Sequence, residues 1–307
     1  MTMDRAMKVG NTRLARLSNI EKMYNLKSAL YAKVESENAS GSIKDRVAVA
    51  IIDGAEKDGK LQKGGVIVEA TSGNTGVGLA LVGKQRGYKT IIVMPDSMSV
   101  ERIELIKSYG GEVVLTDGKK GMQAAVERAQ EIVKNTPNSV LADQFNNPAC
   151  AAAHYQTTGP EIWAQTDGKT DIFVAAVGTG GTLTGTGKFL KEKNVDIRVV
   201  AVEPQKSPLL SQGKAAAHGI QGIGANFIPA VLDRNIYDEV LTVTDEEAFA
   251  IAKLLKKEEN LYVGISSGAN VAAAIALAQR DENAGKNIVT VLPDDGGRYA
   301  SIPQFND

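Results

Sequence analysis

Apolar and polar residues follow one another along the chain in two rhythms, and together they predict an α/β protein. Short runs rich in valine and isoleucine have the length and composition of buried strands. They cover residues 29–34, 66–70, 90–95, 112–116, 171–177, 198–204 and 287–293. Longer segments repeat apolar residues at three- and four-residue spacing, which is typical of amphipathic helices. They cover residues 76–86, 99–109, 120–134, 182–193, 245–259 and 268–280.

Apolar strands that are separated by helices predict mostly parallel sheets with helices on both faces. A chain of 307 residues favours two domains. The strand–helix rhythm weakens over residues 137–170, and we expect the chain to cross between domains near residue 145. A second break, residues 205–235, is rich in Gly, Pro and Ser. We expect a long loop there, and such loops are often functional.

Composition narrows the possible partners. The chain has 35 basic and 36 acidic residues and a net charge of −1, which argues against a nucleic-acid or anionic membrane surface as main partner. Its apolar stretches are shorter than the about 20 residues that cross a bilayer, and residues 1–10 lack the apolar segment of a signal peptide. The single cysteine, Cys150, allows no internal disulfide and suits a cytoplasmic location. With only two histidines besides, we expect no metal site.

A glycine-rich turn at residues 178–182 joins a predicted strand to a predicted helix. Backbone amides of such a turn, together with the helix N-terminus, form a site for a phosphate group. A dinucleotide fingerprint is an alternative, with Glu203 as its ribose acid, but Leu183 occupies its third glycine position. A tight turn without a ligand is also open. A single phosphate is the interpretation that the residues favour.

Lys44 follows a Ser-Gly-Ser turn and precedes apolar residues at helical spacing, so we expect it in the first turn of a helix. Amide N–H groups at a helix start carry partial positive charge, which is unfavourable for an ammonium group. The pattern therefore raises the question of why a lysine stands there.

Two further strand–turn–helix corners carry hydroxyl and amide side chains. Residues 71–76, Thr-Ser-Gly-Asn-Thr-Gly, could hold a small carboxylate at a helix N-terminus. Ser, Thr and Asn are also common N-caps, and taken alone capping is the better interpretation of this segment. Ser266 and Ser267, in the corner at residues 263–274, could likewise be caps and nothing more.

Together these corners resemble one family. The motifs SGSIKDR (40–46), TSGNTG (71–76), GTGGT (178–182), IQGIG (220–224) and GISSGA (264–269) occur in the order seen in cysteine synthases. These enzymes, also called O-acetylserine sulfhydrylases, are fold-type II pyridoxal-phosphate enzymes related to tryptophan synthase β. The resemblance runs from about Gly10 to Tyr299.

The family's fold implies two domains, each a mostly parallel twisted sheet flanked by helices, with the active site in the cleft between them. The smaller N-terminal domain would comprise residues 35–145. The larger domain, which binds the cofactor phosphate, would comprise residues 1–34 with 146–307.

The resemblance also implies a role for each motif residue. Lys44 would hold the cofactor, pyridoxal 5′-phosphate, and act as the catalytic base, and a helix N-terminus would keep its amine uncharged. Ser266 would be the second catalytic residue and face the pyridine nitrogen, and Asn74 would bond the ring 3′-oxygen. The phosphate would be held by Gly178, Thr179, Gly180, Gly181 and Thr182. The carboxylate of the substrate would be held by Thr71, Ser72, Thr75 and Gln144.

The implied reaction is β-replacement of O-acetyl-L-serine by sulfide, giving L-cysteine and acetate through an α-aminoacrylate. A cystathionine β-synthase or a cysteine desulfurating lyase that releases hydrogen sulfide would use the same chemistry, and a nicotinamide-dependent dehydrogenase is a remote alternative. The family further implies a homodimer and binding of the C-terminal tail of serine acetyltransferase.

The chain departs from the family pattern at six positions. Arg13 and Ala39 replace prolines, Glu37 an aromatic residue, Cys150 an asparagine, Asn226 a glycine and Gly297 a glutamate. None of these changes removes a residue with an implied catalytic role. We therefore expect them to bear on the leaving group and the nucleophile more than on the chemistry.

Overall fold

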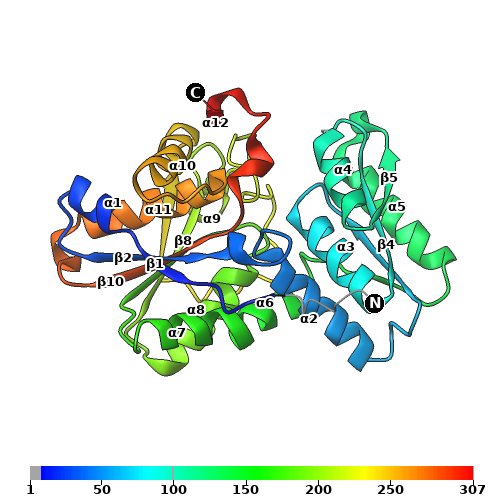
Figure 1. Cartoon of the computed structure of the whole chain (residues 1–307), viewed down its shortest axis with the longest axis horizontal. Helices are drawn as coiled ribbons and strands as arrows, with labels where there is room; N and C mark the ends of the chain where they lie inside the picture. Colours follow the sequence, from blue (N-terminus) through cyan, green and yellow to red (C-terminus); the bar gives the residue numbers. More distant parts are fainter. Residues whose placement is uncertain (1–7, 99, 307) are drawn as a thin grey trace, which may run out of the picture. The chain divides into compact units, whose positions relative to one another are not determined.

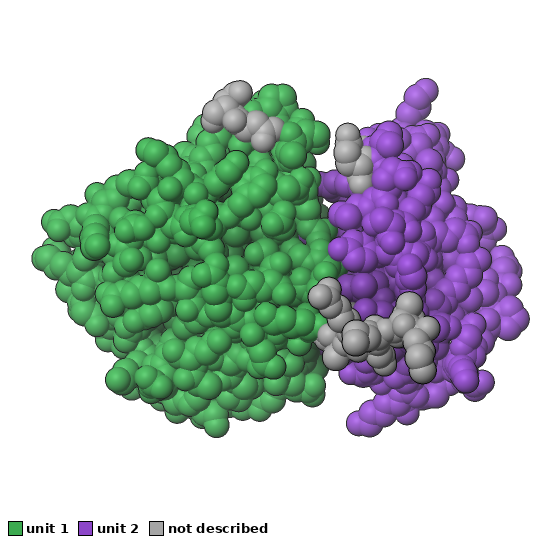
Figure 2. All heavy atoms as spheres, viewed as in Figure 1, with its two compact units in different colours: residues 1–43, 151–307 green, residues 44–150 purple. Residues whose placement is uncertain are grey.

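The computed structural model describes residues 8–98 and 100–306, and the chain divides into two compact units (Figures 1 and 2). Unit 1 comprises residues 1–43 and 151–307, and unit 2 comprises residues 44–150. Residues 35–43 belong with unit 1 because Ile43 N–H donates to Pro293 O and Ser42 forms a bridge with Asp294. The domain boundaries expected at 34/35 and 145/146 stay a prediction. The sequence predicts that there is no signal peptide. That prediction concerns mainly residues 1–7, which lie outside the described residues.

The sheet of unit 1 has six strands in the order β1-β2-β10-β7-β8-β9. In that order they cover Leu14–Arg16, Ala29–Val34, Asn287–Leu292, Ile172–Ala176, Arg198–Pro204 and Glu239–Val243. Only the pairing of β1 with β2 is antiparallel; the other pairs are parallel. The mostly parallel α/β fold predicted from the apolar runs is confirmed. β1 and β9 were not predicted, because their half-exposed residues lack a continuous apolar run.

Helices cover both faces of this sheet (Figure 1). The helices of unit 1 are α1 (Ser18–Met23), α7 (Gly159–Gln165), α8 (Gly181–Lys193), α9 (Leu209–Gln212), α10 (Asp245–Glu258), α11 (Ile265–Ala278) and α12 (Pro303–Asn306). The 3₁₀ turns are η1 (Glu35–Glu37), η4 (Asp281–Asn283) and η5 (Gly296–Tyr299), and η3 (His154–Thr158) is a π-helical turn. Helix α6 (Ala149–Ala153) spans the junction at 150/151. In the described part of the chain, no helix is both long and apolar enough to cross a membrane.

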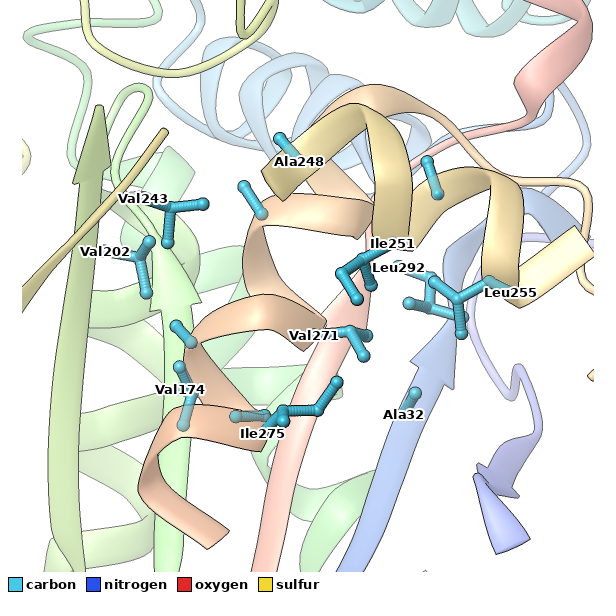
Figure 3. Close-up of a cluster of buried hydrophobic side chains, with 14 of the residues drawn as sticks. Ala32, Val174, Val202, Val243, Ala248, Ile251, Leu255, Val271, Ile275 and Leu292 are labelled. Atoms are coloured by element: carbon cyan, nitrogen blue, oxygen red, sulfur yellow. The ribbon is translucent and has the colours of Figure 1, made fainter. Parts of the chain in front are cut away.

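Alternation along the strands divides the core of unit 1 into two clusters. Val174 of β7 and Val202 of β8 face α10 and α11, where they pack with Ile251 and Val271 (Figure 3). The intervening residues of the same strands, such as Phe173, face α7 and α8 on the opposite side. Both faces are thus buried, which explains why these strands are apolar throughout. Because both faces are covered, the polar loops extend from the edge of the sheet formed by the carboxyl ends of β7 and β8.

Unit 2 has a four-stranded parallel sheet in the order β5-β4-β3-β6. In that order the strands cover Glu112–Thr116, Lys89–Pro95, Val66–Ala70 and Ser139–Leu141. The helices are α2 (Lys44–Lys57), α3 (Asn74–Arg86), α4 (Val100–Ser108) and α5 (Gly121–Asn135), with the 3₁₀ turn η2 (Gly118–Lys120) before α5. Val68 and Val93 face α5, whereas Ile92 and Met94 face α3 and α4. The short strand β6 was not predicted.

Candidate functional site

The glycine-rich turn after β7 is shaped by close backbone packing. A Cβ atom on Gly178 would lie 2.5 Å from the Gly222 carbonyl oxygen, and one on Gly180 would lie 2.7 Å from Leu232 Cβ. Gly180 also has φ of +82°, a left-handed conformation that side chains rarely adopt. It is the N-cap of α8 and provides no side-chain cap. Apart from the Gly181 N–H, which donates to Thr179 Oγ1 at 3.4 Å, the first amides of α8 have no side-chain cap, as an anion site requires.

Two threonine hydroxyls belong to the same turn. Thr179 is buried and its Oγ1 accepts from the Gly181 N–H at 3.4 Å. Thr182 Oγ1 lies 3.3 Å from Nε2 of His154, a buried residue of the π-helical turn η3. The five residues 178–182, predicted to hold a phosphate, are thus contiguous at one helix N-terminus.

The dinucleotide alternative loses the support of Glu203, and Leu183 speaks against it as before. Leu183 is fully buried in the core of unit 1, where a glycine of the fingerprint would permit close helix–strand packing instead. Glu203 is occupied at the start of α9: its carboxylate accepts from the Leu210 N–H at 2.6 Å and from the N–H and hydroxyl of Ser211. A carboxylate with those partners is not presented to a ribose.

Ser266 and Ser267 lie inside α11, one and two residues after its first residue. The N-cap of α11 is Gly264, which makes no side-chain cap, so the interpretation of these serines as caps is wrong. Both are buried, and Ser267 Oγ has no hydrogen-bond partner within the described residues. The helix begins earlier than the apolar periodicity indicated because serine and glycine interrupt the pattern.

Lys44 is the first residue of α2, as predicted. Helix α3 approaches this point closely, because a Cβ atom on Gly78 would lie 3.1 Å from the Lys44 carbonyl oxygen. Cys150 is buried, and burial raises the pKa of its thiol to about 12 although the nearby charge of Lys44 acts in the opposite direction. Gly78 was missed from the sequence, although the repeated glycines in Thr-Gly-Val-Gly (75–78) were a signal for close helix packing.

The predicted carboxylate seat lies at the N-terminus of α3, also in unit 2. The N-cap of α3 is Gly73, which makes no side-chain cap, so capping does not explain the motif. Thr71 Oγ1 instead accepts from the Gly73 N–H at 3.1 Å. Arg102 of α4 donates to the Ser72 carbonyl oxygen at 2.8 Å. These contacts hold the loop without using the first amides of α3.

The structure brings Thr75 and Gln144 together although 69 positions separate them. Thr75 Oγ1 donates to Gln144 Oε1 at 2.5 Å, and both side chains are buried. Four predicted carboxylate ligands are therefore gathered at one end of the unit 2 sheet: Thr71, Ser72, Thr75 and Gln144.

Glu69 is the residue of this corner that sequence reasoning missed. It lies in β3 and is buried. Burial raises the pKa of its carboxyl group to about 8, although hydrogen bonds from Asp143 and Gln144 act in the opposite direction. The Asp143 N–H donates to Glu69 Oε2 at 2.8 Å. A glutamate inside an otherwise apolar five-residue strand was the available signal.

Departures from the family pattern fit their surroundings. Arg13 Nε donates to Glu37 Oε1 at 2.6 Å, so two of the departures pair with each other. Asn226 has φ of +63°, a conformation that asparagine tolerates, and its Oδ1 accepts from Ser207 Oγ at 2.9 Å. The N–H of Gly297 is capped by Asp295.

Comparisons with known proteins show what the whole chain is similar to. A family model described as "Pyridoxal-phosphate dependent enzyme" matches residues 6–294. Cysteine synthase A of Escherichia coli (strain K12) is 47% identical over 313 residues, covering 99% of this chain and 95% of that protein. A cysteine synthase (OASS) structure from Entamoeba histolytica superposes with a TM-score of 0.94 at 40% identity, covering 100% of this chain and 94% of that one. A hydrogen sulfide-producing enzyme from Fusobacterium nucleatum has a TM-score of 0.89 at 44% identity, with coverages of 95% and 97%.

Proposed function

Because the chain belongs to the family of pyridoxal-phosphate dependent enzymes, we propose that it is a cysteine synthase, which replaces the acetate of O-acetyl-L-serine by sulfide. One observation carries the proposal: Lys44 is the first residue of α2, where the helix N-terminus disfavours its ammonium form. A lysine amine that is readily uncharged is the nucleophile that such a cofactor requires. The relatives named cysteine synthase support the choice of reaction.

The residues present fit pyridoxal phosphate. Its phosphate needs several backbone donors and close backbone approach, and the turn at 178–182 offers both, with glycines where a Cβ would clash. Its ring needs small polar partners, and Ser267 Oγ is a buried hydroxyl without a partner in the described structure, beside Ser266. We assign the pyridine nitrogen to Ser266 and the 3′-oxygen to Asn74.

The residues of this chain would divide the work as follows. The turn Gly178–Thr182 would anchor the phosphate, and Lys44 Nζ would hold the cofactor covalently until the amine of the substrate displaces it. The bound cofactor supplies an electron sink for charge that develops at Cα of the amino acid. The freed Lys44 Nζ would accept the Cα proton as acetate leaves Cβ, and it would return that proton to Cα after sulfide has added to Cβ. The carboxylate seat, residues 71–75 with Gln144, keeps Cα over this amine.

Absorbance tests the proposal directly. We expect purified protein to show the visible band of bound cofactor, to shift on addition of O-acetylserine, and to form cysteine when sulfide follows. Lys44→Ala should abolish the lysine-bound band and lower cysteine formation at least about 100-fold, whereas Lys57→Ala, at the exposed end of the same helix, should match the wild type. Absence of cysteine formation with a loaded wild-type protein would refute this function.

A second candidate uses the same site. The hydrogen sulfide-producing enzyme is 44% identical to this chain, close to the 47% of cysteine synthase A of Escherichia coli. With cysteine as donor, the same groups would expel sulfide from Cβ and admit water or a thiol. Values of kcat/KM for O-acetylserine, serine and cysteine decide between the two, and a higher value for cysteine would favour this candidate.

We further propose a homodimer in the cytoplasm, and binding of the C-terminal tail of serine acetyltransferase at the carboxylate seat. A peptide carboxylate resembles the carboxylate of the substrate, which supports the assignment of this partner.

Each of these proposals has its own test. Light scattering that gave a monomer mass near 32.5 kDa would contradict the dimer, and cell fractionation tests the cytoplasmic location. A tail peptide that failed to compete with O-acetylserine would contradict the partner.

A further inference from the structure

The turn that leads into Lys44 is held by a segment from the far end of the chain. The Ile43 N–H donates to Pro293 O at 2.8 Å, and the Asp295 N–H donates to Gly41 O at 3.1 Å. Both partners lie between β10 and η5. The backbone ahead of Lys44 is therefore fixed by residues outside its own helix, and these residues belong to unit 1.

A side chain of the same segment reaches this turn as well. Arg298 of η5 donates from Nη2 to the Ser40 carbonyl oxygen. A Cβ atom on Gly41, which has φ of +85°, would lie 3.4 Å from the same Nη2. A hydrogen bond from a charged donor is stronger than one between neutral groups. Arg298 therefore adds a strong contact to the backbone bonds that hold the turn.

The residue after Arg298 is anchored in the core of unit 1. Tyr299 is buried, and its hydroxyl donates to Asp294 Oδ2 at 2.6 Å. Its ring packs on the buried ring of Phe305, with 5.7 Å between the two centroids. Arg298 thus extends from a packed part of the unit, and its guanidinium has a defined place from which to hold the Ser40 carbonyl.

The sheet of unit 1 relates this anchor to the proposed phosphate site. β10 pairs in parallel with β7, and Thr290 lies opposite Val174. Continued in that register, Pro293 is level with Val177, the residue before the glycine-rich turn. Neighbouring strands lie about 4.8 Å apart. The loop that holds the turn ahead of Lys44 and the loop proposed to hold the phosphate therefore start side by side.

The proposed function gives the Lys44 amine two tasks, and both need a defined position. The amine would bind the cofactor covalently, and once freed it would accept the Cα proton. A lysine side chain is a flexible four-carbon stem. Freedom of the backbone beneath that stem would add to its own, and proton transfer and covalent attack both slow when the reacting groups are poorly placed.

We propose that Arg298 is a positioning residue, which fixes the turn ahead of Lys44 through the Ser40 carbonyl and so sets where the lysine amine stands relative to the glycine-rich turn. This inference rests on the proposed function, because it takes Lys44 as the residue that binds the cofactor. It adds to that function a residue that acts through Lys44.

A double-mutant cycle tests the proposal. The dissociation constant of pyridoxal phosphate is measured by equilibrium dialysis of four loaded full-length proteins: wild type, Arg298→Ala, Lys44→Ala and the double variant. With Lys44 present, Arg298→Ala should weaken binding about tenfold or more, the value of one charge-assisted hydrogen bond. With Lys44→Ala, the same change should stay within about twofold, because there is no amine to place. Equal losses in both backgrounds would assign the effect to structure and refute the positioning role.

A spectrum separates placement of the amine from folding. In Arg298→Ala, the lysine-bound visible band should decrease at equal total cofactor, and guanidinium ion far below denaturing concentrations should restore it by replacing the missing side chain. Arg280→Ala is the matched control. This half-buried arginine of unit 1 pairs with Glu239 at 2.7 Å, and its loss should change neither the band nor the response to guanidinium. An unchanged band in folded Arg298→Ala protein would overturn the proposal.

Two glycine substitutions cover the case in which Arg298→Ala does not fold. Gly41→Ala places a Cβ atom 3.4 Å from Arg298 Nη2 and 3.7 Å from Asp295 Cβ. Gly59→Ala imposes a similar left-handed strain, at φ of +69°, with no atom of the described residues beyond its chain neighbours within 4 Å. Only Gly41→Ala should reduce the lysine-bound band. Equal bands in the two folded variants would contradict the proposal.

Failure of the proposed function gives a different result. A wild type that binds no pyridoxal phosphate, or whose visible band survives Lys44→Ala, would refute the function and this inference together. A wild type whose band is lost in Lys44→Ala, beside an Arg298→Ala protein with the wild-type band and dissociation constant, would refute this inference alone.

Discussion

Two strand–turn–helix corners, β3–α3 in unit 2 and β7–α8 in unit 1, follow the same local plan and differ in what stands behind them. Each has a threonine hydroxyl that accepts the N–H two residues later: Thr71 from Gly73 at 3.1 Å, and Thr179 from Gly181 at 3.4 Å. Each helix has a glycine N-cap and no side-chain cap. Behind the first corner lies the buried carboxylate of Glu69, and behind the second lies the backbone of Gly222.

The difference suggests two ways of preparing a helix N-terminus for an anion. At β7–α8 the proposed phosphate donors are backbone amides, whose direction is set by the chain. At β3–α3 the proposed carboxylate ligands include the side-chain amide of Gln144, whose Oε1 accepts from the Thr75 hydroxyl.

The largest expected effect comes from the charge of Glu69. Its pKa is raised from 4.5 to about 8 in the folded protein, so the neutral form is favoured by folding. The raised pKa of Glu69 therefore adds to the free energy of unfolding below about pH 4.5. This stabilisation is lost as the pH rises through about 8. Denaturation of the wild type should show this loss, on the order of 5 kcal/mol.

Glu69→Gln should lack this component, so its stability relative to the wild type should increase between pH 5 and pH 9. Urea melts of both proteins across this range provide the measurement. Parallel pH profiles would contradict the raised pKa, and they would remove the difference between the two corners.

A matched pair of glycine substitutions compares the corners at the backbone. Gly178→Ala places a methyl group 2.5 Å from the Gly222 oxygen and should cost about 1–3 kcal/mol of stability, with weaker cofactor binding. In Gly73→Ala, the new Cβ atom would have only Thr71 Oγ1 nearby, at 3.8 Å, and Gly73 has an ordinary φ of −118°. This substitution should cost less than about 1 kcal/mol of stability. Thermal melting and cofactor titration measure both, and equal costs would show that the corners tolerate side chains alike.

The smallest effect concerns the two threonine hydroxyls. Thr71→Val removes a hydrogen bond of 3.1 Å and should cost about 1 kcal/mol, whereas Thr179→Val removes one of 3.4 Å and should cost less. Chemical denaturation without cofactor isolates this local term from ligand contacts. A larger cost at Thr179 would reverse the order and show that its hydroxyl has a second structural role.

The sequence by itself determined the fold class and the contiguous motifs. Buried parallel strands are apolar on both faces, so their runs were visible, and Lys44 was correctly expected at a helix start. The phosphate turn was visible because all of its donors are neighbours in the chain. The assignment of roles to these residues still depends on the resemblance, and it remains a proposal.

Only the tertiary structure decided which residues of distant segments form hydrogen bonds with each other. No local pattern in the sequence relates Glu69 to Asp143, or Thr75 to Gln144. These residues meet because the parallel pairing of β3 with β6 brings the ends of the two strands together. The strands β1, β6 and β9 were invisible for a related reason: short or half-exposed strands are stabilised by their neighbours more than by their own composition. The sequence thus specifies which groups are available, and packing determines their partners and their protonation.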